Sequence, residues 1–154
     1  MNKELIKKRF SRKLNSYNEN AKIQKQMAES LINSLISHYS KQKYDNVLEI
    51  GCGTGLLTEL AIKNLVFDNY TAVDIVPDCE NYVKKISSDI DFFSNDVENF
   101  INTTQNKYDL ILSNASFQWI ENLPDFIHKL VKKLNENGIL LFSSFGKENF
   151  REIY

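Results

Sequence analysis

Five short apolar runs, each followed or preceded by a helical pattern, constrain the fold of this chain more than any other feature. The runs are rich in Val, Ile, Tyr and Phe and span residues 46–50, 70–75, 90–94, 108–113 and 139–145. Segments with helical spacing lie between them, at 54–65, 78–87 and 123–135, with a helical or irregular piece at 97–104. Such alternation predicts an α/β fold with a mainly parallel sheet connected by right-handed crossovers.

The first 40 residues follow a different pattern. From Leu5 to about Tyr39, apolar residues recur at spacings of three to five, with a break near residues 15–20, so we expect two helices ahead of the sheet. With 154 residues, 42% of them hydrophobic, the chain is long enough for one domain with a core and too short for two.

Local capping signals support the predicted helix boundaries. Thr54 is suited to cap the helix that begins near it, and Asp78 is suited to open the next one. Gly138 follows the predicted helix 123–135, where a left-handed residue often ends a helix.

Composition excludes several classes of protein. No apolar run reaches the length of a membrane span, and the N-terminus has no apolar signal region, so we expect a cytoplasmic protein without membrane attachment. Cys52 and Cys79 are the only cysteines and belong to no CxxC or Cys/His cluster, so neither a metal site nor a disulfide framework is predicted.

Charge is distributed unevenly along the chain. Residues 1–25 contain eight Lys and Arg against Glu4 and Glu19, a net charge of +6; because the whole chain carries −1, the remainder carries −7. The basic arm is either a solvated helical face or a surface that docks an acidic partner. Nucleic acid is a poor candidate for that partner, since the rest of the chain is acidic and the basic residues are not interleaved with aromatics.

A glycine-rich loop follows the first predicted strand, in the sequence NVLEIGCGTGLL. Such a loop directs backbone N–H groups and the positive end of a helix toward a ligand at the sheet edge. A phosphate-binding P-loop would require Gly-Lys-Ser/Thr, but two leucines follow Gly55. The dinucleotide fingerprint would require Gly or Ala in place of Leu56, which counts against NAD without excluding it.

The pattern formed by Glu49, Gly51, Gly53 and Gly55 resembles that of class I S-adenosylmethionine-dependent methyltransferases. This resemblance implies a Rossmann-like fold with strand order 3-2-1-4-5. It also implies that the loop, including Cys52, wraps the methionine end of S-adenosylmethionine, with Glu49 facing the ammonium group.

Two further acidic residues follow the next two strands. Asp74, 19 residues after Gly55, can accept hydrogen bonds from both hydroxyls of a ribose, and Ile75 adjoins it. The resemblance implies that Asp96 binds the adenine amino group and that the Val97 backbone amide faces the ring. Three acidic residues after successive strands favour a cofactor site over solvated carboxylates.

The segment after the fourth strand contains Asn114, Gln118 and the single tryptophan, Trp119. These side chains are either strand-end caps and a core aromatic or part of a substrate site. Their N-A-x-x-Q-W pattern resembles two families of carboxylate O-methyltransferases. These families act on malonyl-[acyl-carrier protein] in biotin synthesis and on trans-aconitate. The former is also similar at "KKRFSRKLNSYNENAKIQKQMAESL" and at "LLFSSFGKENFREI".

The resemblance to the malonyl family implies O-methylation of the free carboxylate of malonyl-[acyl-carrier protein] or malonyl-CoA. It implies that residues 1–40 form a helical lid over an S-adenosylmethionine-binding core, residues 41–154. We predict Tyr17 on this lid and Gln118 as catalytic residues, and Arg151 as the cation that binds the carboxylate by two parallel hydrogen bonds. The basic arm would then dock an acidic acyl carrier protein. A methyltransferase for trans-aconitate or another small acid or small molecule, and a non-catalytic S-adenosylmethionine-binding module, remain the alternatives.

Chains of this family continue beyond the fifth strand with further helices and two more strands, and this sequence ends at Tyr154. We therefore expect cofactor binding with weak or absent turnover. We also expect the fifth strand to be an exposed edge through which a homodimer could form.

Overall fold

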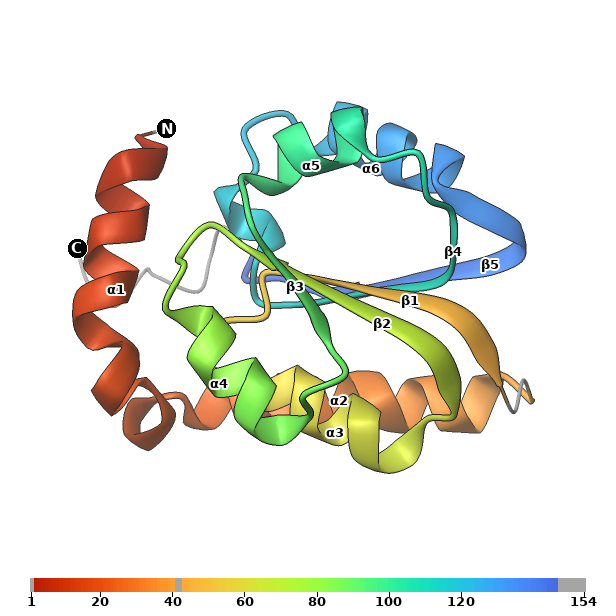
Figure 1. Cartoon of the computed structure of the whole chain (residues 1–154), viewed down its shortest axis with the longest axis horizontal. Coiled ribbons are helices and arrows are strands. Elements are labelled where there is room, and N and C mark those ends of the chain that lie inside the picture. The colour runs from red at the N-terminus through yellow and green to blue at the C-terminus, as the bar shows by residue number, and fades with distance from the viewer. Residues whose placement is uncertain (1, 41–42, 147–154) are drawn as a thin grey trace.

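A computed structural model describes residues 2–40 and 43–146 (Figure 1). Its sheet has five strands in the order β3-β2-β1-β4-β5, and every neighbouring pair is parallel. The predicted α/β fold and its strand order are confirmed. The strands are β1 (Tyr44–Ile50), β2 (Phe67–Asp74), β3 (Asp91–Ser94), β4 (Tyr108–Asn114) and β5 (Leu134–Ser143).

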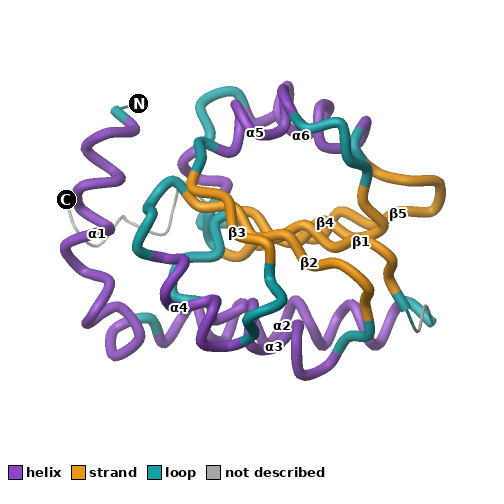
Figure 2. The backbone as a smooth tube through the Cα atoms, viewed as in Figure 1, coloured by secondary structure: helices purple, strands orange, loops and turns teal. Residues whose placement is uncertain are grey.

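Helices form a layer on each face of the sheet, and one helix lies outside both layers (Figures 1 and 2). One face is covered by α2 (Lys22–His38), α3 (Leu56–Asn64) and α4 (Cys79–Ile86). The other is covered by α5 (Val97–Thr103) and α6 (Leu123–Lys132), with the short 3-10 helix η1 (Phe117–Trp119) after β4. The first helix, α1 (Lys3–Asn20), stands at the carboxyl ends of the strands.

Alternation along the strands divides the core in two. Val47 of β1 packs with α2 and α3 residues, whereas Leu48 and Ile50 pack with α5 and α6 residues. Successive side chains of a strand point to opposite faces, so one strand contributes to both clusters. The buried Glu49 shares the face of Val47, below the carboxyl end of the strand.

The two N-terminal helices differ in their attachment. α2 buries Ala28, Leu31, Ile32 and Leu35 in the same cluster as the sheet, whereas Leu14 is the only buried residue of α1. Within the predicted lid of residues 1–40, only α1 therefore lies outside the core layers. None of the helices in the described part of the chain is long and apolar enough to cross a membrane.

Several predicted boundaries were wrong by a few residues. The break between α1 and α2 lies at Ala21, and Gly55 rather than Thr54 precedes the first turn of α3. The left-handed residue near the predicted helix end is Asn137 (φ 62°), and both Asn137 and Gly138 lie within β5. β5 begins early because Leu134 already pairs with Tyr108, followed by an irregularity before regular pairing resumes at Ile139.

Candidate functional site

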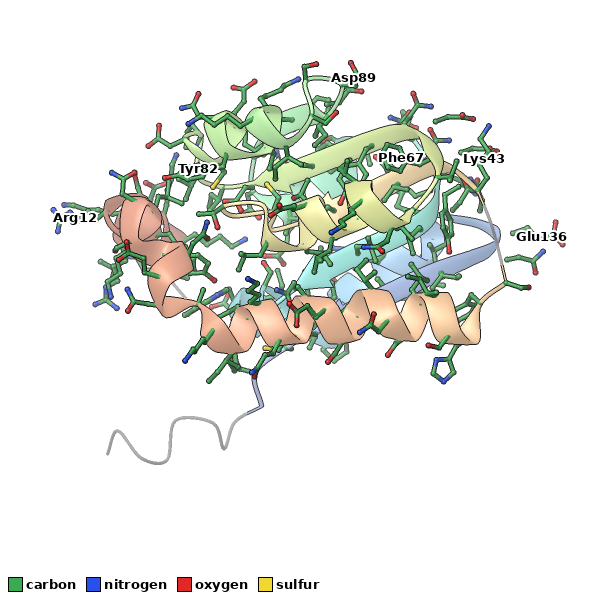
Figure 3. All side chains as sticks on the ribbon, turned by 90° about the horizontal axis from the view of Figure 1, so that it is seen from below. Arg12, Lys43, Phe67, Tyr82, Asp89 and Glu136 are labelled. Atoms are coloured by element: carbon green, nitrogen blue, oxygen red, sulfur yellow. The ribbon has the colours of Figure 1, made fainter. Side chains whose placement is uncertain are left out.

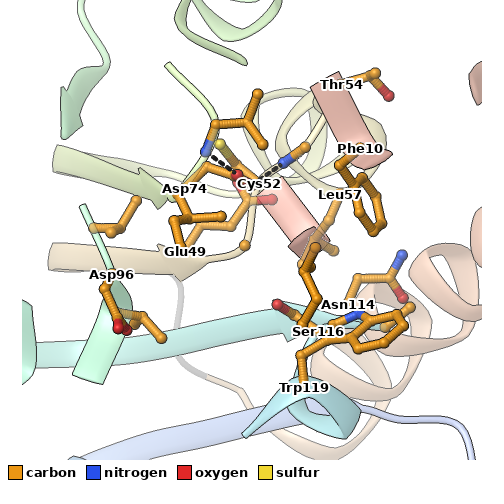
Figure 4. A pocket seen from close by; sticks show the side chains of 18 of the residues that line it. Phe10, Glu49, Cys52, Thr54, Leu57, Asp74, Asp96, Asn114, Ser116 and Trp119 are labelled. Carbon is orange, nitrogen blue, oxygen red and sulfur yellow. Dashed lines mark hydrogen bonds between the residues drawn. The ribbon is translucent and has the colours of Figure 1, made fainter. Parts of the chain in front are cut away.

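A pocket with about 970 Å³ of empty space, which includes open solvent, lies at the carboxyl ends of β1, β2, β3 and β4 and is also lined by α1. Parallel sheets commonly bind ligands at this edge. Figure 4 shows Asp96 on one side, Asn114 and Trp119 on the other, and Asp74 with Glu49 between them. The pocket is thus lined by residues from the ends of β1, β2, β3 and β4.

The three glycines of the loop have positive φ angles and different surroundings. A Cβ on Gly51 would collide with the side chain of Ser116, and a Cβ on Gly55 would lie 2.5 Å from Cδ1 of Ile86. A Cβ on Gly53, in contrast, would meet no atom within 4 Å. Gly51 and Gly55 therefore permit close packing within the protein, whereas Gly53 leaves space for a ligand near the backbone.

Glu49 is a buried carboxylate in the wall of the pocket, 1% exposed. Its Oε2 accepts hydrogen bonds from the Tyr70 hydroxyl at 2.6 Å and the Thr58 hydroxyl at 2.7 Å. Burial raises the pKa of Glu49 to about 7, although both hydroxyl donors act in the opposite direction. A bound cation would favour the ionised form of this side chain.

Asp74 connects the end of β2 to the glycine loop. Its Oδ2 accepts from the Gly53 N–H at 2.8 Å and its Oδ1 accepts from the Val76 N–H at 2.9 Å (Figure 4). Burial raises the pKa of Asp74, and these backbone donors partly offset that effect. The carboxylate is thereby held in one orientation beside Gly53, with lone pairs left for further donors.

Asp96 lies at the end of β3 and caps α5. Its Oδ1 accepts from the Glu98 N–H at 3.0 Å, and its Oδ2 contacts the ammonium group of Lys3 from α1. The same ammonium contacts Glu98, and all three side chains are about one-third exposed. α1 is therefore joined to this side of the pocket by a half-buried group of three charges.

Aromatic side chains from α1 and η1 border the opposite side. The Phe10 ring lies 5.7 Å from the Tyr17 ring and 6.4 Å from the Trp119 ring, measured between centroids. Burial, followed by the nearby charge of Asp74, raises the pKa of Tyr17. Asn114 lies beneath them with both ends of its amide engaged, because Nδ2 donates to the Gln24 carbonyl and Oδ1 accepts from another side chain.

A family model described as a methyltransferase domain matches residues 12–152. The chain belongs to this methyltransferase domain family. The chain is 42% identical to the malonyl-[acyl-carrier protein] O-methyltransferase of Priestia megaterium, over 100% of this chain and 56% of that protein. It is 35% identical to the protein of the same name from Prosthecochloris aestuarii, over 99% of this chain and 59% of that protein.

The methyltransferase domain thus spans little more than half the length of these curated relatives. Among solved structures it is similar to the plantazolicin methyltransferase BpumL in complex with S-adenosylhomocysteine. That match has a TM-score of 0.72 and 21% sequence identity, and covers 92% of this chain and 55% of the other. The shared fold is the class I arrangement predicted from the glycine loop.

The pocket brings together most of the predicted site residues. Gly55 is not in its lining, and neither is Gln118, whose amide nitrogen donates to the Ala115 carbonyl at 2.6 Å. Arg151 lies outside the described residues. The predicted residues that do line the pocket are Tyr17, Glu49, Gly51, Cys52, Gly53, Asp74, Ile75, Asp96, Val97 and Asn114.

Sequence reasoning missed Lys3, Thr58 and Tyr70 as parts of the site. Tyr70 could have been found from strand register, because Val47 pairs with Tyr70 and side chains two residues apart share a face. Thr58 lies in the first turns of α3, directly above the strand end that carries Glu49. Lys3 carries no such signal, since nothing in the local sequence fixes where the free end of α1 lies.

Proposed function

We propose that this chain binds S-adenosylmethionine and directs its methyl group to a carboxylate. The observation that carries the proposal is the arrangement of Glu49, Asp74 and Asp96 at three successive strand ends around one pocket. S-adenosylmethionine carries an ammonium group, two ribose hydroxyls and an adenine amino group, each of which a carboxylate can bind. An NAD site is disfavoured, since Leu56 replaces the small third residue of that fingerprint.

The residues present fit this cofactor. The open space beside Gly53 suits a ligand that approaches the loop backbone closely, and the oriented carboxylate of Asp74 adjoins it. Glu49 would hold the ammonium group, Asp74 the ribose hydroxyls, and Asp96 the adenine amino group, with Val97 beside the ring. The bound cofactor supplies an electrophilic methyl group on a sulfonium.

We further propose malonyl-[acyl-carrier protein] as the methyl acceptor. The support is the name of the relatives that the chain matches along essentially its entire length. A malonyl carboxylate has a reference pKa near 4 and is ionised at neutral pH, so no general base is required. The protein must instead align the carboxylate oxygen and exclude water around it.

Phe10 and Trp119 lie on the side of the pocket opposite Asp96 (Figure 4), and the Tyr17 ring packs against Phe10, so the three rings are suited to exclude water. In this proposal α1 is the lid, since it contributes two of the three rings. Tyr17, Gln118 and Arg151 keep their predicted catalytic roles as proposals. The contact between Gln118 and Ala115 would have to change before Gln118 could reach an acceptor.

The proposal is tested by incubating the protein with methyl-labelled S-adenosylmethionine and either malonyl-[acyl-carrier protein] or trans-aconitate. We expect a base-labile methyl ester on the malonyl group only, in a low yield that agrees with the weak turnover predicted above. Labelling of trans-aconitate alone would transfer the assignment to the other carboxylate methyltransferase family. Absence of any label with bound cofactor would favour a non-catalytic binding module.

A further inference from the structure

The outer surface of α1 is a basic face, which we define as Lys7, Lys8, Arg9, Arg12 and Lys13. None of these five side chains forms an ion pair within the described residues. All but Lys7 are exposed, and Figure 3 shows Arg12 pointing away from the body of the molecule. The only acidic residues in α1 are Glu4 and Glu19.

This concentration of charge does not stabilise the helix that carries it. Lys8 and Arg12 are four residues apart, as are Arg9 and Lys13, and like charges at this spacing destabilise a helix. With Leu14 as its only buried residue, α1 has little packing to offset these costs.

The basic face adjoins the mouth of the pocket. Ile6, Phe10 and Tyr17 of the same helix line that pocket from its inner side. A shallow surface groove between α1 and the loop after β2 is lined by Lys7, Lys8, Ser11 and Arg12 and reaches Val76, which also lines the pocket. A partner bound to the basic face would therefore lie beside the opening.

We propose that the basic face docks an acidic carrier protein and so presents a tethered acyl group to the pocket. The inference rests on the proposed function, and it adds the surface by which the acceptor is recognised. α1 contains six Lys and Arg against Glu4 and Glu19, a net charge of +4; because the whole chain carries −1, the rest carries −5. An acidic partner is attracted to α1 and repelled elsewhere, which orients it during encounter and raises its association rate.

Charge reversal tests this surface. The double variant Lys8→Glu/Arg12→Glu is compared with Lys107→Glu/Lys132→Glu, which changes the net charge equally at exposed sites away from α1. Binding of malonyl-[acyl-carrier protein] to each protein is measured by fluorescence anisotropy at several salt concentrations. We expect the α1 variant to bind the carrier protein at least about tenfold more weakly than the unaltered protein, mainly because association is slower. Its binding should also depend less on salt. The control variant should bind within about twofold of the unaltered protein.

Two further measurements separate this inference from the proposed function. Titration with S-adenosylhomocysteine, followed by Trp119 fluorescence, should give the same affinity for both variants, because neither alters a pocket residue. Methyl transfer to malonyl-CoA, which has no protein surface, tests the proposed function alone. Equal weakening by both double variants, or no binding of the carrier protein to the unaltered chain, would overturn the docking surface even where malonyl-CoA is methylated.

Discussion

Glu49 is the residue whose proposed role leads to the most quantitative prediction. Its pKa of about 7 means that the empty pocket holds a proton on this carboxyl group at acidic pH. An ammonium group bound beside it would favour ionisation. With the pKa returned to its ordinary value near 4.5, binding at pH 6 should release about 0.9 proton, and affinity should rise about fifteenfold between pH 5.5 and 7.0. The ligand's own amino group remains protonated over this range.

Calorimetric titration with S-adenosylhomocysteine in buffers of different ionisation enthalpy measures this proton release directly. Glu49→Gln is the perturbation, since an amide oxygen can still accept from Tyr70 and Thr58 but carries no titratable proton. We expect weaker binding by the variant, with most of the proton release and of the pH dependence lost. Asp74 also has a raised pKa, so the difference between the two proteins is the informative quantity. Equal proton release by both proteins would refute the role given to Glu49.

Further predictions concern stability, the loop and the lid. The folded protein keeps a proton on Glu49 that the unfolded chain loses above pH 4.5, so the free energy of unfolding of the ligand-free protein should fall as pH rises from 4.5 to 7. Urea denaturation measures this free energy, and it should fall less over the same pH range in Glu49→Gln. Tyr70→Phe removes a hydrogen bond that lowers the Glu49 pKa, so proton release on binding should shift to higher pH; an unchanged midpoint would contradict this. Gly55→Ala should lower the free energy of unfolding by about 1–2 kcal/mol, mainly through backbone strain, because Cδ1 of Ile86 is the mobile end of its side chain. Gly53→Ala should cost about 1 kcal/mol and mainly weaken ligand binding. Lys3→Met removes the ion pairs that Lys3 of α1 forms with Asp96 and Glu98, each worth about 0.2–1 kcal/mol when exposed. Amide hydrogen exchange at the start of α1 should therefore accelerate severalfold at most. Unchanged exchange would show that these pairs do not hold the helix in place.

The sheet was predictable because hydrophobic periodicity and the glycine loop are local signals. A short strand, a loop and a helix repeated in order leave few topologies, and parallel pairing brings Glu49, Asp74 and Asp96 to one edge. The approximate extents of β1 to β4 followed from the same pattern. The start of β5 did not, because the pairing of Leu134 with Tyr108 is a tertiary contact that precedes the left-handed residue Asn137 within the strand.

The unpredicted parts of the site depend on contacts between distant segments. Thr54 appeared suited to cap α3, but its hydroxyl instead donates to Asn18 of α1. Asn114 was predicted at the pocket and lines it, yet its amide also fixes the first turn of α2 through the Gln24 carbonyl. Lys3 reaches Asp96 across 93 positions of the sequence, a contact that only the placement of α1 determines.

The most direct test of the central claim is a parallel titration of the protein with S-adenosylhomocysteine and with NAD, observed by calorimetry and by the fluorescence of Trp119. This single tryptophan is 38% exposed and lines the pocket, so a ligand there should change its emission. We expect saturable binding of S-adenosylhomocysteine that is weakened by replacing Asp96 with alanine, and no binding of NAD. Saturable binding of NAD, with no response to S-adenosylhomocysteine, would contradict the assignment of this pocket to a methyl donor.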